Sequence, residues 1–303
     1  MRWISVLACV ACVAACGATE TKSPHKARRG DDGGGEVFGR GDKFKPTAFS
    51  VDVEGPDDGR PVILIPGLGC PGEVWEEVVA HLTKHGYQTH TLTLAGFAGQ
   101  PTIDEPLSQA ARRDLTRYVR AKKLKHPIII GHSMGGFIAY WIASYHPELV
   151  GPVIIVDASP ALSGDLDEAK ALRDKWRKAD DDVYFAQVRG AFMSMTHHAE
   201  RMKPIIDLIV KSDRKAIGDA IFEMMQTDLT SAVKDIKAPV LIIAADGGLK
   251  QRIIAQTATI PDHQVVVVPR AAHFVMWDEP KAFFAAMDTF IDAHDEASDE
   301  DRD

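Results

Sequence analysis

Short apolar runs of strand length recur along the chain, each bounded by glycine, proline or polar residues. Near-continuous valine, isoleucine and leucine predicts strands that are buried on both faces, as in a parallel sheet covered by helices. An earlier segment, Phe49–Glu54, alternates between apolar and polar residues, which predicts an antiparallel edge strand. The buried runs are Val62–Ile65, Gln88–Leu94, Pro127–Gly131, Val153–Val156, Pro239–Ala244 and Gln264–Val268.

Apolar residues at helical spacing lie between these runs, so predicted strands and helices alternate. This alternation predicts an α/β fold, with a mostly parallel sheet flanked by helices. It breaks between Ser159 and about Lys237, where the pattern is helical and predicts a lid over the C-terminal edge of the sheet. The helices expected outside that insertion are Val74–His85, Leu107–Lys123, Met134–Tyr145, Leu249–Ala258 and Pro280–Ala293.

The N-terminal residues do not follow the strand–helix alternation and have the pattern of an export signal. Arg2 precedes the apolar stretch Ile4–Ala15, which is too short to span a bilayer and is typical of an export signal. The sequence VAACG that follows (residues 13–17) resembles the lipobox of bacterial lipoproteins, in which the cysteine carries lipid. We therefore expect a signal over residues 1–16 and a lipid anchor at Cys16 in the bacterial cell envelope. The alternative is an ordinary secretory signal that is cleaved near Ala18 and releases a soluble protein.

Composition divides the remaining chain. Residues 17–45 contain seven glycines and almost no large apolar residue, which predicts a flexible linker. Residues 294–303 form an acidic tail, so the folded domain is expected over residues 46–293.

The net charge of −8 argues against nucleic-acid binding, since that function needs a basic surface. Cys70 is the one cysteine beyond Cys16, so the domain has no internal disulfide.

The candidate nucleophile is Ser133. It lies in the sequence GHSMGG (residues 131–136), a G-x-S-x-G pattern between a predicted strand and a predicted helix. That context is typical of a nucleophile elbow, in which small residues allow a sharp turn that exposes the serine hydroxyl. His273 follows the last predicted strand, so the order serine before histidine suits it as the general base.

A glycine-rich loop, PGLGC (residues 66–70), follows the first buried strand. In an acyl-transfer site two backbone amides stabilise the developing oxyanion. The expected donors are Leu68 in this loop and Met134, which directly follows the candidate nucleophile.

Taken together these segments resemble the α/β-hydrolase superfamily, specifically its lid-bearing branch of esterases, lipases and peptidases. The resemblance covers residues 60–293 and rests on IPGLG, LTLAGFAGQP, GHSMGG, VIIVDASP, QTDL and RAAHFVMWDEPKAF. It implies an eight-stranded, mostly parallel sheet and a Ser–His–acid triad that needs neither metal nor cofactor.

The triad acid is where the sequence departs from the family pattern. Gly248 occupies the position after the Pro239–Ala244 run where many members carry the acid. Asp157, directly after Val153–Val156, and Asp246 are the two substitutes, and Asp157 is favoured because carboxylates at strand ends face the active-site edge. Asp278, before Glu279 and Pro280, is expected to cap the last helix.

The predicted activity is hydrolysis of a carboxylic ester with a small or medium apolar acyl group, through an acyl-enzyme. An acyltransferase would use the same residues, and a catalytically inactive binding lipoprotein is the alternative of another class. A proline-iminopeptidase-like peptidase would need carboxylates in the lid that hold a free amine. The candidates for that role are Asp165, Asp167, Glu168 and Asp180–Asp182. The sequence does not indicate an oligomeric state.

Overall fold

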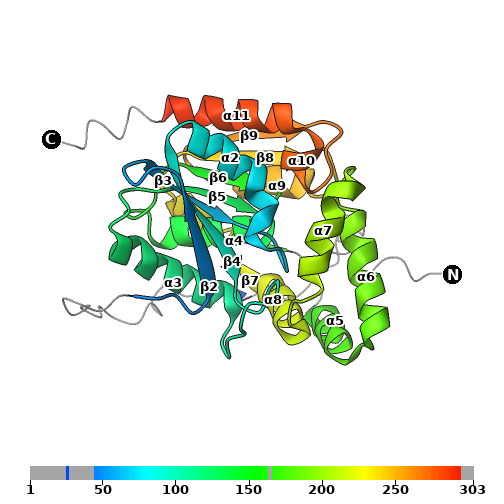
Figure 1. The fold of residues 1–303 in the computed structure, drawn as a ribbon. Helices are drawn as coiled ribbons and strands as arrows, with labels where there is room; N and C mark the ends of the chain where they lie inside the picture. The colour runs from blue at the N-terminus through cyan, green and yellow to red at the C-terminus, as the bar shows by residue number, and fades with distance from the viewer. Residues whose placement is uncertain (1–24, 27–43, 163–165, 295–303) are drawn as a thin grey trace.

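A seven-stranded sheet forms the centre of the molecule (Figure 1), a computed structural model that describes residues 25–26, 44–162 and 166–294. The strand order is β2-β4-β3-β5-β6-β8-β9, in which β2 pairs antiparallel with β4 and the other six strands run parallel. The described residues thus hold seven strands of this sheet where the family pattern implied eight. Their bounds are β2 Phe49–Glu54, β3 Arg60–Ile65, β4 Tyr87–Leu94, β5 Ile128–His132, β6 Val153–Val156, β8 Val240–Ala245 and β9 His263–Val268.

Helices cover both faces of this sheet. In Figure 1, α2 and α11 lie on one face, whereas α3 and α4 lie on the other. Eleven of the twelve residues of α4 are buried, because this helix packs between the sheet and α3. The bounds are η1 Gly72–Trp75, α2 Glu76–Lys84, α3 Leu107–Lys122, α4 Met134–Tyr145, α9 Lys250–Thr257, α10 Val275–Asp278 and α11 Pro280–Ala293.

The central strands are buried on both faces, which explains their unbroken apolar sequence. Every residue of β5, β6 and β8 is buried, and most residues of each strand are aliphatic, with valine or isoleucine in all three. β-branched residues suit such strands because they pack well on a pleated surface. This rigid layer fixes the strand ends, from which the candidate site residues project.

Four α-helices lie in the described part of the stretch between β6 and β8, and we refer to this stretch as the helical insertion. Its α8 is tied to α3, because the buried carboxylate of Glu223 accepts hydrogen bonds from the amides of Ser108 (2.7 Å) and Gln109 (2.9 Å). The stretch also contains a two-residue strand, Thr227–Asp228, which pairs with His25–Lys26 and which the helical pattern did not predict. The bounds are α5 Leu166–Lys178, α6 Asp181–Met193, α7 Ala199–Ile209, α8 Arg214–Gln226, β7 Thr227–Asp228 and η2 Val233–Asp235.

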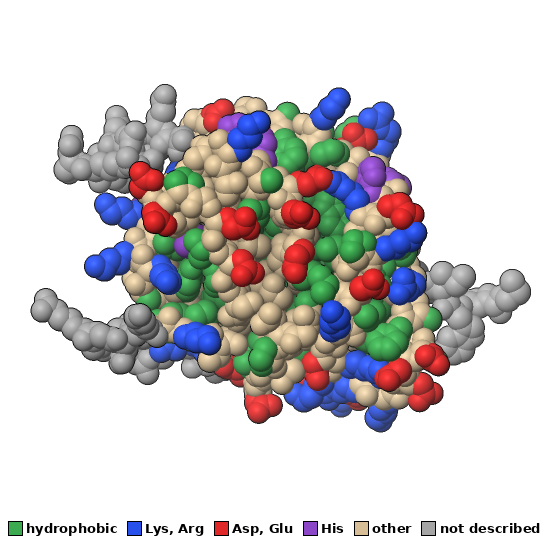
Figure 2. Space-filling model, viewed as in Figure 1, with side chains coloured by type: hydrophobic (Ala, Val, Ile, Leu, Met, Phe, Trp, Pro, Cys, Tyr) green, Lys and Arg blue, Asp and Glu red, His purple; other side chains and the backbone are tan. Residues whose placement is uncertain are grey.

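Acidic and basic side chains are interspersed over the face seen in Figure 2, and hydrophobic side chains lie between them. Among the described residues, no helix combines the length and the apolar character that a membrane crossing needs. The expected signal (residues 1–16), Cys16, nearly all of the linker and the tail after His294 lie outside the described residues.

Candidate active site

Ser133 lies at the sharp turn between β5 and α4, with φ 55° and ψ −119°. A non-glycine residue in this region is strained, and such strain occurs where the fold holds a functional side chain in place. At Gly135 the backbone of the turn passes close to the end of β3. A Cβ atom at this position would lie 2.1 Å from the carbonyl oxygen of Ile65, so the turn requires glycine here. Glycine at this position lets α4 begin directly against the end of β3, which raises Ser133 above the sheet edge.

His273 meets Asp157 at this edge. The Nδ1 atom of His273 lies 2.7 Å from Asp157 Oδ2, and both side chains are at least nine-tenths buried. The other carboxylate oxygen of Asp157 accepts a hydrogen bond from the amide of Ala245 at 3.0 Å. A carboxylate fixed in this way holds the proton of the imidazole on Nδ1 and leaves Nε2 free to accept a proton.

Asp246, the other candidate acid, points elsewhere. Its carboxylate forms an ion pair with Lys250, the first residue of α9, and its side chain is 45% exposed. The structure therefore brings Asp157, and not Asp246, into hydrogen-bonding contact with His273.

The two expected oxyanion donors are both at the sheet edge, in buried segments. Met134 is the first residue of α4, and Leu68 lies in the turn that the Cys70 amide closes on the Gly67 carbonyl. Within the described ranges, neither the Leu68 nor the Met134 amide donates to a backbone carbonyl. The Met134 amide, at the N-terminus of α4, is suited to a developing negative charge, and the Leu68 amide is the expected second donor.

Ser133, Met134, Asp157 and His273 border one small cavity of about 20 Å³, roughly the space of one water molecule. Its other walls are mostly apolar, and no lysine or arginine is among them. Met224 of α8 is part of this wall, so the helical insertion contributes to the cavity beside the serine. The remaining lining residues are Phe137, Ala158, Ser159, Leu162 and Leu249.

His132, the middle residue of the G-x-S-x-G pattern, has a role that the sequence analysis missed. Its Nε2 atom lies 2.9 Å from the carbonyl oxygen of His273, and its ring packs on those of His273 and Phe274. Burial, together with the neighbouring His273, holds the pKa of His132 well below its usual range. The ring is therefore neutral and donates from Nε2, which anchors the backbone of His273.

Asp278 does not cap α11, contrary to the prediction. The residue before α11 is Glu279, and its side chain makes no capping bond. The Asp278 carboxylate instead accepts hydrogen bonds from Thr196 Oγ1, the His197 amide and the Ala272 amide. Sequence reasoning missed this because two of those donors come from the helical insertion, about 80 positions earlier in the chain.

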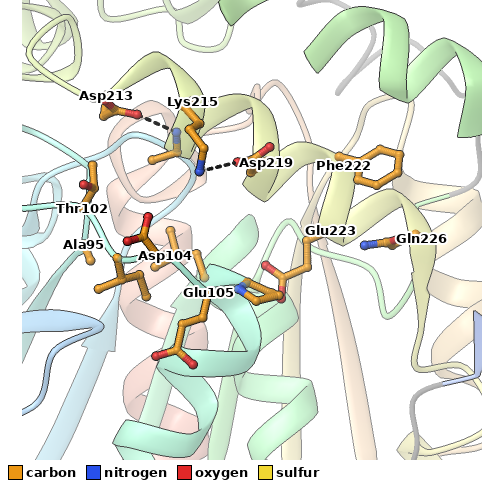
Figure 3. A pocket seen from close by; sticks show the side chains of 14 residues that line it. Ala95, Thr102, Asp104, Glu105, Asp213, Lys215, Asp219, Phe222, Glu223 and Gln226 are labelled. Carbon is orange, nitrogen blue, oxygen red and sulfur yellow. Dashed lines mark hydrogen bonds and ion pairs between the residues drawn. The ribbon is translucent and has the colours of Figure 1, made fainter. Parts of the chain in front are cut away.

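A larger cavity of about 310 Å³ lies between the loop after β4 and α8 (Figure 3). It is rich in carboxylates, and four of the five have partners. Asp213 accepts the Ala216 amide, Asp219 pairs with Lys215 at 3.3 Å, Glu105 pairs with Arg113, and Glu223 holds the first amides of α3. None of its lining residues borders the cavity at Ser133, so these carboxylates lie apart from the serine. Among them, Glu223 ties the insertion to α3.

Other candidate groups are separate from this site. Within the described ranges, no three His, Cys, Asp or Glu residues form a group suited to a metal ion. His197 and His198 directly precede α7, and both are exposed. Burial raises the pKa of the free Cys70 thiol to about 12, so this residue is not a thiolate nucleophile.

Comparison with known proteins places this geometry in a family. The model of the alpha/beta hydrolase family matches residues 62–286. A pimeloyl-(acyl-carrier protein) methyl ester esterase from Edwardsiella ictaluri is 26% identical over 247 residues, which cover 77% of this chain and 93% of that protein. An N-formylmaleamate deformylase from Pseudomonas putida is 26% identical over 250 residues, with 77% and 89% covered.

Solved structures share the fold. An esterase from Exiguobacterium antarcticum superimposes with a TM-score of 0.73 at 18% identity, covering 80% of this chain and 95% of that one. The enol-lactonase from Burkholderia xenovorans gives a TM-score of 0.71 at 18% identity, with 80% and 96% covered. The family match extends over most of the folded domain and includes the turn at Ser133 and the loop at His273. The chain belongs to the alpha/beta hydrolase family.

Proposed function

We propose that this protein is a serine hydrolase that cleaves carboxylic esters with a small to medium apolar acyl group. The single observation that carries the proposal is the 2.7 Å contact between His273 Nδ1 and Asp157 Oδ2, beside a serine held at a strained strand–helix turn. Such a pair supplies a base with the correct tautomer next to the nucleophile. Curated relatives of this chain include methyl ester esterases, which supports ester cleavage.

In the proposed mechanism, Ser133 Oγ attacks the ester carbonyl while His273 Nε2 takes the hydroxyl proton. The amides of Leu68 and Met134 stabilise the oxyanion, and Asp157 stabilises the imidazolium that forms. The intermediate then collapses, and His273 gives its proton to the departing alcohol. Water, activated by the same histidine, attacks the acyl-enzyme and releases the acid and free Ser133.

The walls of the small cavity support a neutral acyl group. Met224, Leu162 and Leu249 offer apolar contact, and Asp157 is the one charged acid among the lining residues. An aminopeptidase would need further carboxylates there to hold an ammonium group. Of the lid carboxylates considered for that role, Asp181 pairs with Arg214 and Asp165 lies outside the described residues.

The test is hydrolysis of p-nitrophenyl esters of increasing acyl length by the purified wild type and by Ser133→Ala. We expect turnover of short esters by the wild type and a loss of about three orders of magnitude or more in Ser133→Ala. Equal rates for the two proteins on every ester would overturn the esterase proposal. Aminoacyl p-nitroanilides in the same assay distinguish amide cleavage, and inertness to both substrate classes would favour a binding protein.

We also propose that the protein is exported and anchored in the cell envelope through lipid on Cys16. The proposal rests on the VAACG sequence after a short apolar stretch. Metabolic labelling with an alkyne-tagged palmitate should mark the wild type and leave Cys16→Ser unlabelled. Labelling of neither protein would favour the ordinary secretory signal.

A further inference from the structure

One carboxylate joins the helical insertion to the loop that carries His273. Asp278 Oδ1 accepts hydrogen bonds from Thr196 Oγ1 at 2.6 Å and from the His197 amide at 2.8 Å. Its Oδ2 accepts one from the amide of Ala272 at 2.8 Å. Thr196 and His197 belong to the connection between α6 and α7, and Ala272 directly precedes His273. Asp278 therefore bridges the insertion and the candidate base.

A second bond joins the same two segments on the other side of His273. The amide of Phe274 donates to the carbonyl of Met195 at 3.2 Å. Both neighbours of His273 are thus held by the α6–α7 connection, Phe274 directly and Ala272 through Asp278. The peptide groups that flank the imidazole cannot shift away from that connection unless these bonds break.

The carboxylate is well suited to this role because its donors satisfy both oxygen atoms. In the described part of the chain, no lysine or arginine forms an ion pair with Asp278, so N–H and O–H donors stabilise its charge. Hydrogen bonds to an ionised acceptor are stronger than neutral ones. Loss of any donor from the insertion therefore weakens the hold on the His273 loop.

The position of the bridge next to the candidate base gives it a function. The cavity beside Ser133 is bordered by His273 and by Met224 of the insertion, so a substrate that enters it contacts both the base and the insertion. We propose that Asp278 is a positioning residue, through which the seating of the α6–α7 connection places His273 against Asp157 and Ser133. This inference rests on the proposed hydrolase function. It means that the base is aligned when the α6–α7 connection is seated against the His273 loop.

Two variants and a matched control test the bridge. Thr196→Val removes one donor from the insertion but leaves the bond between Asp278 and Ala272, whereas Asp278→Asn disturbs both sides. Thr230→Val is the control, because Thr230 Oγ1 makes the same kind of bond to Asp228 at 2.6 Å in a segment that does not border the cavity. If Asp278 has a purely structural role, the two bridge variants should melt at lower temperatures, while kcat and KM measured below those temperatures stay unchanged.

With p-nitrophenyl acetate, we expect kcat to fall by about tenfold or more in Thr196→Val and Asp278→Asn, with little change in KM, because misalignment of the base slows chemistry more than binding. Thr230→Val should stay within about twofold of the wild type. Values of kcat within twofold of the wild type for both bridge variants would overturn the proposal. If Asp278→Asn does not fold, Thr196→Val alone decides.

A second measurement is independent of ester turnover. The proton on His273 Nδ1, hydrogen-bonded to Asp157, should give a low-field proton NMR signal that Asp157→Asn abolishes. We expect this signal to shift or broaden in Thr196→Val and to remain in Thr230→Val. If the wild type is inert to all esters but shows this pattern of signals, the bridge is supported and the proposed hydrolase function is contradicted. An unchanged signal in Thr196→Val would contradict the bridge.

Discussion

Asp157 and His273 are 116 positions apart in the chain, and the structure places Asp157 Oδ2 at 2.7 Å from His273 Nδ1. The Ala245 amide fixes the second carboxylate oxygen, so Asp157 is held by the end of β8 while it faces the end of β9. Asp157 itself has a φ of 46°, which turns its side chain away from β6 and toward the histidine. Strand ends of a parallel sheet converge on one edge, and this edge carries every candidate catalytic group.

Replacing this acid should stop catalysis while leaving the fold intact. We expect Asp157→Asn to lower kcat by about three to four orders of magnitude, since the amide favours the wrong imidazole tautomer. Asp246→Asn is the matched control and should change kcat by less than about twofold, because Asp246 pairs with Lys250 at the surface. The measurement is kcat on p-nitrophenyl acetate. The opposite ranking of the two variants would assign the acid to Asp246.

The glycine at the start of α4 should tolerate no side chain. A Cβ at Gly135 would meet the Ile65 carbonyl at 2.1 Å, so Gly135→Ala has to move α4 away from β3. We expect the free energy of unfolding to fall by about 1–3 kcal/mol or more. We also expect esterase activity to be lost. Gly190→Ala, on the exposed face of α6 with nothing within 4 Å, should gain about 0.5–1 kcal/mol. Urea denaturation of both variants checks this, and equal effects would contradict it.

Buried histidines should make the fold sensitive to acid. Burial lowers the pKa of His132 well below its usual range, and burial with Lys122 nearby lowers the pKa of His90 to about 4. The unfolded chain therefore binds more protons than the folded one below about pH 6.5. The stability that these groups contribute is present above that pH and is lost as the pH falls toward their folded pKa values.

We expect the free energy of unfolding to decrease by about 1.4 kcal/mol per pH unit for each such proton below pH 6.5. His132→Gln should flatten this dependence by about one proton. Urea denaturation at several pH values compares the two proteins. Parallel curves would mean that His132 takes up a proton in the folded state.

Met224 should limit the length of the acyl chain. It is buried in α8 and borders the cavity beside Ser133, so Met224→Ala enlarges the space for the substrate. We expect kcat/KM for the hexanoate ester to rise by about tenfold relative to the acetate ester. Met225→Ala is the control, since Met225 is half-buried and does not border the cavity. An unchanged ratio in Met224→Ala would place the acyl group elsewhere.

Much of the fold could be predicted from local pattern. The observed bounds of β2, β6, α4 and α11 coincide with the predicted Phe49–Glu54, Val153–Val156, Met134–Tyr145 and Pro280–Ala293. The other predicted elements differ from the observed ones by one or two residues at one or both ends. The hydrophobic pattern of these segments is clear, and glycine, proline or polar residues mark where they end. Glycines around Ser133 signalled the turn because no other residue fits the contact between α4 and β3.

The features that the sequence did not predict share a common cause, which is that their contacts join distant parts of the chain. His132 was visible in the G-x-S-x-G pattern, but its bond to the His273 carbonyl joins positions 141 apart. Asp278 precedes a proline at the start of a helix, which locally predicts a cap, yet its donors lie in the helical insertion. The strand at Thr227–Asp228 exists through its pairing with residues 25–26 and has no local pattern of its own.

The sequence by itself determined the alternation of strands and helices, the position of the serine turn and the histidine loop, and membership of the alpha/beta hydrolase family. It did so because hydrophobic periodicity and glycine requirements act over a few residues. The tertiary structure alone decided which aspartate contacts His273, that Met224 of α8 borders the cavity beside Ser133, and that Asp278 bridges the insertion and the histidine loop. Those outcomes depend on where distant strand ends and helices meet, and a hydrogen bond across that distance leaves no periodic signal in the chain.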